Sequence, residues 1–218
     1  MLTANIAHEI RNPLSAISHA NQLLQEEINL PGTSARMLEI IEDNAQRINQ
    51  IIKDVLELNR RDRTVQETIA LKKFMIDFHH QFCAIEKIPA THFTFELCPE
   101  HTSIRFDRRH LTQILWNLCK NAWEHGCKKI NSLHLICAAQ DVNGISPHGF
   151  QIKVIDDGAG IAEEDRNKLF EPFYTTKTTG NGLGLYISRE LAEANNAQLI
   201  FQPLAQGSAF ILQLKISD

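Results

Sequence analysis

The spacing of the apolar residues changes near residue 60 of this 218-residue chain, and that change restricts the fold more than any other feature. Up to residue 60, apolar side chains recur at intervals of three, four or seven, which is the period of one face of an α-helix. The pattern predicts one helix from Asn5 to about Ile28 and a second after the Pro- and Gly-containing turn at 29–34. The apolar stripes are Ile6, Ile10, Ile17, Leu24 and Ile28, then Leu38, Ile41, Ala45, Ile48, Ile52, Val55 and Leu58.

Two antiparallel helices of this length cannot bury their apolar stripes completely against each other. Pairing with a second copy into a four-helix bundle solves that problem, so the sequence predicts a homodimer. The apolar pattern stops at a charged cluster, residues 60–63. We therefore assign 1–63 to the hairpin domain, 64–70 to a linker and 71–218 to a second domain.

The second domain is predicted to mix strands and helices. Apolar residues alternate or gather in β-rich runs at 92–97, 103–106, 131–138, 150–155, 198–204 and 208–216, and helical spacing occupies 107–124, 162–169 and 183–194. The last two strands are joined by the short segment Ala205-Gln206-Gly207, which is typical of a hairpin, so the sheet is not purely parallel. The predicted fold class is α+β.

Composition excludes several classes of protein. With 22 basic and 26 acidic residues the net charge is −4, which offers no general positive field for nucleic acid or anionic lipid. The five cysteines form no C-x-x-C pair, so we expect reduced, buried thiols in a cytoplasmic compartment. No apolar run reaches the roughly 18 residues of a membrane span, so this fragment is expected to be soluble, without membrane contact.

The first segment with chemical potential is residues 8–14, His-Glu-Ile-Arg-Asn-Pro-Leu. His8 lies off the apolar stripe and is expected to face solvent, where an imidazole is partly neutral and nucleophilic. Glu9 could hold one ring nitrogen protonated, and Asn12, four residues on, shares the face of His8. An unremarkable surface histidine remains an alternative. A zinc-protease motif does not fit, because Asn12 occupies the position of the second histidine.

The second segment is a polar row in the helix predicted at 107–124. Asn117, Asn121 and His125 step by four among apolar neighbours, which is costly unless a polar ligand binds there. A Mg²⁺ ion bridging phosphate oxygens would satisfy such amides, because it prefers few protein oxygens and several waters. A structural hydrogen-bond network is the alternative for any one asparagine.

Two glycine-containing segments follow. The strand at 150–155 runs into Asp156-Asp157-Gly158-Ala159-Gly160-Ile161, where a backbone could approach a ligand closely and Asp156 could accept from an exocyclic amine. Later, 180–185 reads Gly-Asn-Gly-Leu-Gly-Leu and opens a helix, whose free N–H groups suit phosphates. Neither segment fits a Rossmann fingerprint, and the chain contains no P-loop, so a nucleotide would bind by another scheme.

The order of these motifs resembles that of bacterial sensor histidine kinases. Their H, N, G1, F and G2 boxes correspond to residues 8–14, 117–121, 156–160, 170–173 and 180–185. Residues 8–17, the short lid after Phe-Tyr-Thr-Thr-Lys and Glu193-Ala194-Asn195 are most similar to the nitrogen-regulation and type IV pilus sensor branch. The resemblance implies a dimeric phosphotransfer hairpin followed by an ATP-binding sandwich of the gyrase and Hsp90 type.

The resemblance also implies roles for individual residues. His8 would attack the γ-phosphate of ATP with Glu9 orienting it, Asn121 would bind Mg²⁺, and Asp156 would receive the adenine amine. The remaining implied ATP-binding residues are Asn117, Lys120, His125, Gly158, Gly160, Ile161, Thr176, Lys177, Gly182, Leu183, Gly184 and Leu185. Asn12 matches a phosphatase position, which implies activity toward the phosphorylated partner as well.

The implied partner is the receiver domain of a response regulator of the NtrC-type activator class. An ATP hydrolase of the same superfamily and an inactive nucleotide-binding scaffold remain as alternatives, and the first is disfavoured because Asn117 cannot act as a base. His8 lies close to Met1, whereas the first helix of the family extends upstream. We therefore expect a longer parent protein, anchored in the inner membrane with this part in the cytoplasm.

Overall fold

The computed structural model describes residues 14–24, 32–60, 64–96, 102–139, 149–176 and 182–215. The chain divides into two compact units. Unit 1 contains Met1–Arg60 and Glu171–Gly184, and unit 2 contains Arg61–Phe170 and Leu185–Asp218. The predicted α+β class is confirmed, because unit 1 carries a helical hairpin and unit 2 a mixed sheet with helices.

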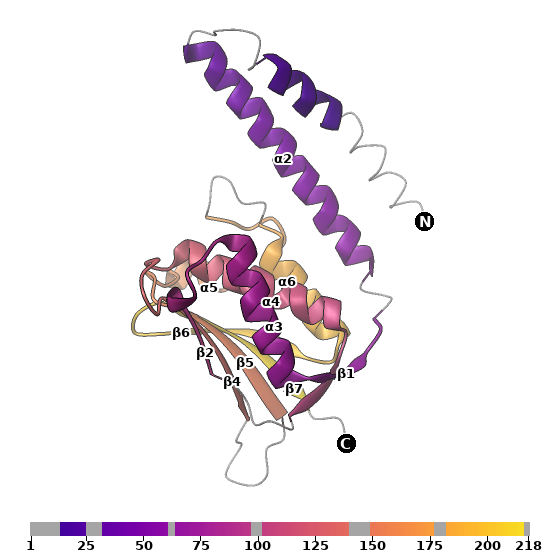
Figure 1. The fold of residues 1–218 in the computed structure, drawn as a ribbon, viewed down its shortest axis with the longest axis vertical. Helices are drawn as coiled ribbons and strands as arrows, with labels where there is room; N and C mark the ends of the chain where they lie inside the picture. The colour runs from indigo at the N-terminus through magenta and orange to yellow at the C-terminus, as the bar shows by residue number, and fades with distance from the viewer. Residues whose placement is uncertain are drawn as a thin grey trace. The chain divides into compact units, whose positions relative to one another are not determined.

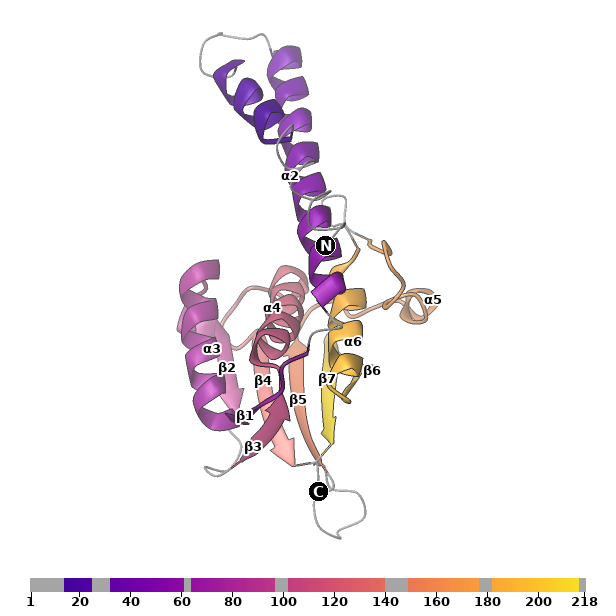
Figure 2. The ribbon, with the colours of Figure 1, turned by 90° about the vertical axis from the view of Figure 1, so that its right-hand side faces the viewer.

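Unit 1 contains two antiparallel helices, residues 14–24 and α2 (Gly32–Arg60), which lie side by side (Figures 1 and 2). Their buried seam consists of Leu14, Asn21, Leu38, Ala45 and Ile52. These residues are spaced by seven within each helix, so each helix keeps one face against the other. The seam includes one polar contact, in which Asn21 Nδ2 donates to the carbonyl of Leu38 at 2.9 Å.

Much of the apolar stripe of the hairpin is exposed in the single chain. The exposed large apolar side chains of its described residues are Ile17, Leu23, Leu24, Met37, Ile40, Ile41 and Ile48. Ile41 and Ile48 are one heptad apart on α2, and Ile17 and Leu24 are one heptad apart on the first helix, so each pair continues one side of the seam. The two helices therefore leave a continuous apolar stripe uncovered, as the sequence predicts for one half of a larger bundle.

Unit 2 is built on a five-stranded mixed sheet in the order β2-β4-β5-β7-β6. The strands are β2 (Phe93–Glu96), β4 (Leu133–Ala139), β5 (Gly149–Asp156), β6 (Gln198–Pro203) and β7 (Ser208–Lys215). β2 runs parallel to β4, and the other neighbours are antiparallel. In the register of the central strands, Asp156 lies opposite both Leu133 and Ser208. The end of β5 therefore sits in the middle of the sheet, flanked on both sides.

Three helices cover one face of this sheet (Figures 1 and 2): α3 (Leu71–Glu86), α4 (Arg108–His125) and α6 (Gly184–Ala194). The core between them contains Phe82, whose ring packs edge-on against Trp116 with centroids 5.0 Å apart. Phe82 also meets Phe93 of β2 at 5.7 Å, which joins α3 to the sheet. Such edge-to-face contacts fix the positions of α3 and α4 on the strands.

The remaining elements are short. β1 (Glu67–Ala70) and β3 (Ser103–Phe106) form a separate two-stranded antiparallel sheet. A 3₁₀ turn, η2 (Ala90–His92), precedes β2, and α5 (Glu163–Arg166) is a single helical turn where the sequence predicts a helix over 162–169. β1 occupies part of the segment assigned to a linker, and α3 was not among the predicted helices.

The described cysteines are free thiols, of which Cys119 and Cys137 are buried as predicted. Cys83 is half-buried and Cys127 is exposed, so the prediction of buried thiols is wrong for these two. Burial raises the pKa of Cys119 well above its ordinary value, which keeps that thiol protonated and unreactive. Among the described residues, no helix has the length and hydropathy needed to cross a membrane.

Candidate functional site

The polar row predicted from the sequence lies on α4, in its C-terminal half. Asp107 is the N-cap of α4, and its carboxylate accepts from the N–H groups of Arg109 and His110. Asn117 and Asn121 are half-buried and His125 is exposed in the last turn. Asn117 Nδ2 lies 3.4 Å from the hydroxyl of Ser188 on α6, which spans the gap between the two helices. The row therefore consists of two partly sheltered amides and one accessible imidazole on one face of the helix.

Asp156 is the last residue of β5 and its side chain points to the buried face of the sheet, only 5 % exposed. Its Oδ1 accepts from the N–H of Gly158 at 2.9 Å, and its carboxylate also accepts from the N–H of Ser208. Burial is the main reason that its pKa is raised, and the neighbouring charge of Asp157 adds to this, while the two hydrogen bonds oppose it. Asp156 is thus a fixed acceptor in a partly desolvated position.

Two glycines allow the turn after β5 to approach its neighbours. A Cβ built at Gly158 would lie 2.3 Å from the carbonyl oxygen of His125, so this turn lies directly against the end of α4. A Cβ at Gly207, where φ is +79°, would lie 1.8 Å from the carbonyl oxygen of Asp156. Only glycine fits either position without moving backbone atoms. The structure therefore brings the end of the polar row and the Asp156 turn into contact.

Asp157 joins the same two segments from the outer side. Its Oδ1 accepts from the N–H of Cys127 at 2.8 Å, and its Oδ2 lies 3.6 Å from the ammonium of Lys129. Although partial burial opposes the effect, the hydrogen bond from Cys127 and the charge of Lys129 lower the pKa of Asp157. The Gln206 side chain also donates to the carbonyl of Asp157 at 3.4 Å. Three turns, at 126–129, 156–160 and 204–207, are held together around this pair of acids.

The glycine segment before α6 belongs to unit 1. Gly182 has φ +68°, and a Cβ there would lie 2.4 Å from the carbonyl carbon of Phe173, so residues 173 and 182 are in backbone contact. The N–H of Tyr174 donates to the carbonyl of Glu171 at 3.3 Å. Leu183 is buried, and Gly184 is the first residue of α6. The glycines therefore admit a tight backbone crossing immediately before the helix begins.

Comparison with family models assigns both parts of the chain. Residues 1–64 match the His Kinase A (phospho-acceptor) domain, and residues 106–218 match the histidine kinase-, DNA gyrase B-, and HSP90-like ATPase family. The chain belongs to the sensor histidine kinase family. The predicted family is thereby confirmed.

Curated relatives of this histidine kinase chain agree with the predicted branch. It is 37% identical over 212 residues to the sensor protein kinase PilS of Pseudomonas aeruginosa. This match covers 94% of this chain and 38% of PilS. It is 28% identical over 220 residues to the sensor histidine kinase ZraS of Escherichia coli, which covers 99% of this chain and 45% of ZraS. The chain thus spans less than half the length of these two relatives.

A solved structure of similar fold is histidine kinase ThkA in complex with response regulator protein TrrA. This chain is 27% identical to that structure's chain, with a TM-score of 0.66, and the match covers 99% of this chain and 61% of that one. The match includes both units, so each has the fold of the corresponding part of that protein.

The predicted site residues of this kinase separate into three groups. His8, Glu9, Asn12 and Lys177 lie outside the described residues. Thr176, Gly182, Leu183 and Gly184 belong to unit 1. Unit 2 holds the remaining positions: the half-buried Asn117, Asn121, Ile161 and Leu185, the buried Asp156 and Gly158, and the exposed Lys120, His125 and Gly160.

Three residues that help to build this region were not singled out as site residues from the sequence. Gly207 admits the close approach to Asp156, Asp157 holds the turn after α4, and Ser188 meets Asn117. Gly207 carries a weak signal, since a glycine between two adjacent strands indicates a tight turn. The partners of Asp157 and Ser188 depend on contacts 30 and 71 residues apart in the chain, which no local pattern contains.

Proposed function

We propose that this chain uses ATP to phosphorylate His8 and then passes the phosphoryl group to an aspartate of a response regulator receiver domain. The observation that carries the proposal is the Asp156 carboxylate, buried at the end of β5 and in contact through Gly158 with the end of the Asn117–His125 row. In a chain that also matches the phospho-acceptor domain, this is a nucleotide site adjoining a polar helix face.

The base of ATP is assigned to Asp156. A buried carboxylate whose position is fixed by two backbone N–H groups has a remaining lone pair for the exocyclic amine of adenine. Half-buried Ile161 and Leu185 are assigned to the apolar faces of the base, and His125 to its edge. Gly158 and Gly160 keep the turn thin enough for the base to approach.

The phosphates are assigned to the other end of the site. Asn117 and Asn121 offer half-buried amide oxygens one turn apart, and the described residues include no group of three His, Cys, Asp or Glu that could hold a metal ion. Such a sparse oxygen set fits Mg²⁺, which keeps several waters and binds phosphate oxygens directly. When bound, the ion would neutralise phosphate charge beside Asn121. Lys120, Thr176, Lys177, Gly182, Leu183 and Gly184 keep the assignment to ATP that the family resemblance implies.

The transfer itself needs one nucleophile and one orienting group. A ring nitrogen of His8 forms a bond to the γ-phosphorus while the bond from that phosphorus to the β–γ bridging oxygen breaks, and ADP leaves. Glu9 accepts a hydrogen bond from the other ring nitrogen and stabilises the positive charge that the ring develops. Because phosphoryl transfer depends mainly on position and charge, these few groups suffice.

We assign the exposed apolar stripe of the hairpin to a homodimer. Ile17, Leu24, Ile41 and Ile48 would be covered by the same residues of a second copy, as an isologous interface requires. The domain bounds stay at 1–63, 64–70 and 71–218, with β1 inside the second range. The parent protein is proposed to be anchored in the inner membrane.

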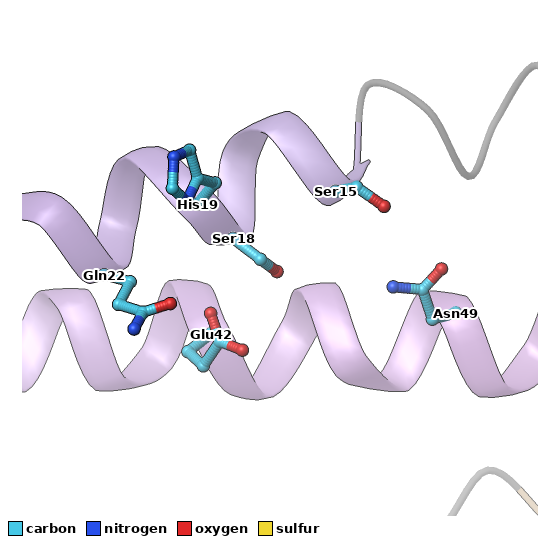
Figure 3. A pocket seen from close by; sticks show the side chains of 6 residues that line it. All are labelled: Ser15, Ser18, His19, Gln22, Glu42 and Asn49. Atoms are coloured by element: carbon cyan, nitrogen blue, oxygen red, sulfur yellow. The ribbon is translucent and has the colours of Figure 1, made fainter.

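The receiver domain is assigned to the side of the buried seam that lies opposite the exposed apolar stripe. A polar pocket of about 460 Å³ is lined by Ser15, Ser18, His19, Gln22, Glu42 and Asn49 (Figure 3). Ile41 and Glu42 are neighbours that point about 100° apart on α2, so the pocket and the apolar stripe flank the seam. Figure 3 shows Ser18 pointing toward α2 and Asn49 pointing back. A receiver of the NtrC-type class could dock here without displacing the second copy.

Incubation with γ-labelled ATP and Mg²⁺ tests the kinase reaction. Wild type should acquire acid-labile, alkali-stable label, and His8→Ala should acquire none. His19→Ala is the matched control, because His19 is an exposed histidine of the helix at 14–24 and its loss should leave the label intact. Label that persists in His8→Ala refutes the assignment. Free phosphate without labelled protein would favour the hydrolase alternative.

The proposed phosphatase activity rests on Asn12, whose amide would orient a water against the phosphoaspartate of the regulator. Asn12→Ala should keep autophosphorylation and slow the loss of phosphate from a phosphorylated receiver domain. Equal rates of loss for the variant and wild type would remove Asn12 from this role.

A further inference from the structure

The N-terminus of α4 contains a buried polar cluster far from the nucleotide motifs. The cluster consists of Asp107, His110 and Asn195, of which Asp107 is only 1 % exposed. The N–H of Asp107 donates to Asn195 Oδ1 at 2.8 Å, and Asn195 Nδ2 lies 3.0 Å from His110 Nδ1. Asn195 Nδ2 also donates to the carbonyl of Leu191 at 2.7 Å. These contacts join the start of α4 to the end of α6.

A third segment is attached to the same cluster. Asp107 Oδ2 accepts from the backbone N–H of Val65 at 2.9 Å, while its Oδ1 caps α4 by accepting from Arg109 N–H at 2.9 Å. The Val65 side chain is 67 % exposed, so the contact involves only its backbone. Although burial opposes it, the hydrogen bonds from Val65 and Arg109 lower the pKa of Asp107, which keeps the acceptor ionised at neutral pH.

The contact at Val65 shortens the length of free chain between α2 and unit 2. α2 ends at Arg60, and the first strand of unit 2, β1, begins at Glu67. If unit 2 held the chain only from β1, seven residue steps would separate Arg60 from the anchor, a reach of at most about 25 Å. Because Asp107 holds the chain at Val65, only five steps remain, and the reach falls to at most about 18 Å.

We propose that Asp107 is a positioning residue that clamps the chain at Val65 and so shortens the tether between the hairpin and the nucleotide-binding unit. This inference rests on the proposed function, since a short tether raises the effective concentration of bound ATP around His8. The clamp is built into the helices that carry the site: α4 starts at it and reaches Asn117 and Asn121, and α6 ends at it.

Two substitutions remove the clamp from opposite sides. Val65→Pro deletes the donor and leaves Asp107 and α4 intact. In Asp107→Asn the amide oxygen still caps α4, but the NH₂ group faces the Val65 N–H. Two donors then oppose each other, and the hydrogen bond to Val65 is lost. Val65→Ala, which keeps the N–H, and Arg109→Ala, which removes only the 3.3 Å ion pair with Asp107, are the matched controls.

In the whole chain, both clamp variants should lower kcat of autophosphorylation about twofold or more, with KM for ATP and the Kd of an ATP analogue unchanged. The amide of Val65, which Asp107 holds in wild type, should exchange at least tenfold faster in Asp107→Asn. The double variant should resemble either single variant, because both substitutions remove the same hydrogen bond between Val65 and Asp107. The control variants should behave as wild type.

A change in Kd, or Val65→Ala behaving as Val65→Pro, would show that the contact is merely structural and would overturn the proposal. So would an unchanged kcat in Asp107→Asn when its Val65 amide exchanges faster, or an unchanged kcat in Val65→Pro. If wild type takes up no label at all, the proposed kinase reaction fails, whereas the hydrogen-exchange measurement still tests the clamp by itself.

Discussion

Asp156→Asn is the substitution that tests the nucleotide assignment most directly. The wild-type carboxylate accepts from two backbone N–H groups, those of Gly158 and Ser208, and is assigned the adenine amine as a third donor. A carboxamide has one oxygen, so its NH₂ group must face one of these three donors. The two side chains have nearly the same volume, so the substitution replaces one acceptor by a donor and removes the negative charge without changing the packing.

The expected loss of ATP affinity follows from that exchange. A hydrogen bond to a charged group contributes about 1.5–3 kcal/mol, which corresponds to a loss of roughly 10- to 150-fold in Kd. The preference for adenine should fall as well, because the new NH₂ can donate to the O6 acceptor of guanine. We expect the ratio of GTP affinity to ATP affinity to rise in the variant.

Stability of the unliganded chain should move in the opposite direction. The folded state raises the pKa of Asp156, chiefly by burial, so it binds a proton more tightly than the unfolded chain does. The free energy of unfolding then falls as pH rises from the ordinary aspartate value of about 3.8 through the raised value. The carboxamide of the variant cannot ionise, so Asp156→Asn should gain stability relative to wild type over that range and keep the gain at pH 7.

Asp157→Asn is the matched control, because the neighbouring acid has a lowered pKa. Asp157 contributes stability above its unfolded pKa and loses it as pH falls through the folded value, so Asp157→Asn should be destabilised at pH 7 and approach wild type in acid. Urea unfolding from below the ordinary aspartate pKa of 3.8 up to pH 7 and calorimetric titration with an ATP analogue measure both effects. An Asp156→Asn variant that binds ATP within twofold of wild type, or is destabilised increasingly toward pH 7, would refute the reasoning.

Two further predictions concern packing. Gly158→Ala places a Cβ 2.3 Å from the carbonyl oxygen of His125, so the turn or the end of α4 must move. We expect the free energy of unfolding in urea to fall by about 1–3 kcal/mol and ATP binding to weaken. A variant with wild-type values for both would contradict the contact. Ile41→Glu puts a charge into the exposed apolar stripe and should give a monomer by sedimentation at concentrations where wild type and the exposed-site control Arg47→Glu are dimers. If the Ile41→Glu variant is still a dimer, the interface does not include the exposed apolar stripe.

The sequence predicts those elements best whose signals are local. β3 has the predicted bounds, and α4 begins one residue after the expected start because Asp107 supplies an N-cap that is visible in the sequence. α3 was missed although Phe74, Phe78 and Phe82 repeat every four residues and are buried. The four-residue strand β1 precedes it directly, and β1 exists only through pairing with β3, which lies more than 30 residues away.

Two other elements show how context adjusts local signals. α5 is one turn rather than the predicted two, because its residues Glu163 to Arg166 are all polar and none is buried, so packing does not extend it. At the end of α6, Asn196 has φ +58°, the left-handed conformation that glycine commonly adopts after a helix. Asparagine tolerates that conformation, so the helix ends there without a glycine.

In the candidate site, too, the local patterns could be predicted and the contacts between distant residues could not. Asp156 and the Asn117–His125 row could be picked out because each forms a pattern within a few residues of sequence. That they adjoin could not be derived, since the contact needs the register of β5 with β7 and the close passage of Gly158 under the end of α4. The contributions of Gly207 and Ser188 were invisible for the same reason.

The adjacent acids at the end of β5 show why their order is fixed. In β5 the buried side chains alternate through Ile152, Val154 and Asp156, so the alternation carries Asp156 inward. Asp157 falls outside the strand, where the N–H of Cys127 and the ammonium of Lys129 reach it. The inward acid is costly when ionised and the outward acid is stabilised when ionised, so the two partly offset each other at neutral pH. A nucleotide that donates to Asp156 relieves the cost of the buried charge, and binding should therefore stabilise this end of the sheet more than the rest of unit 2.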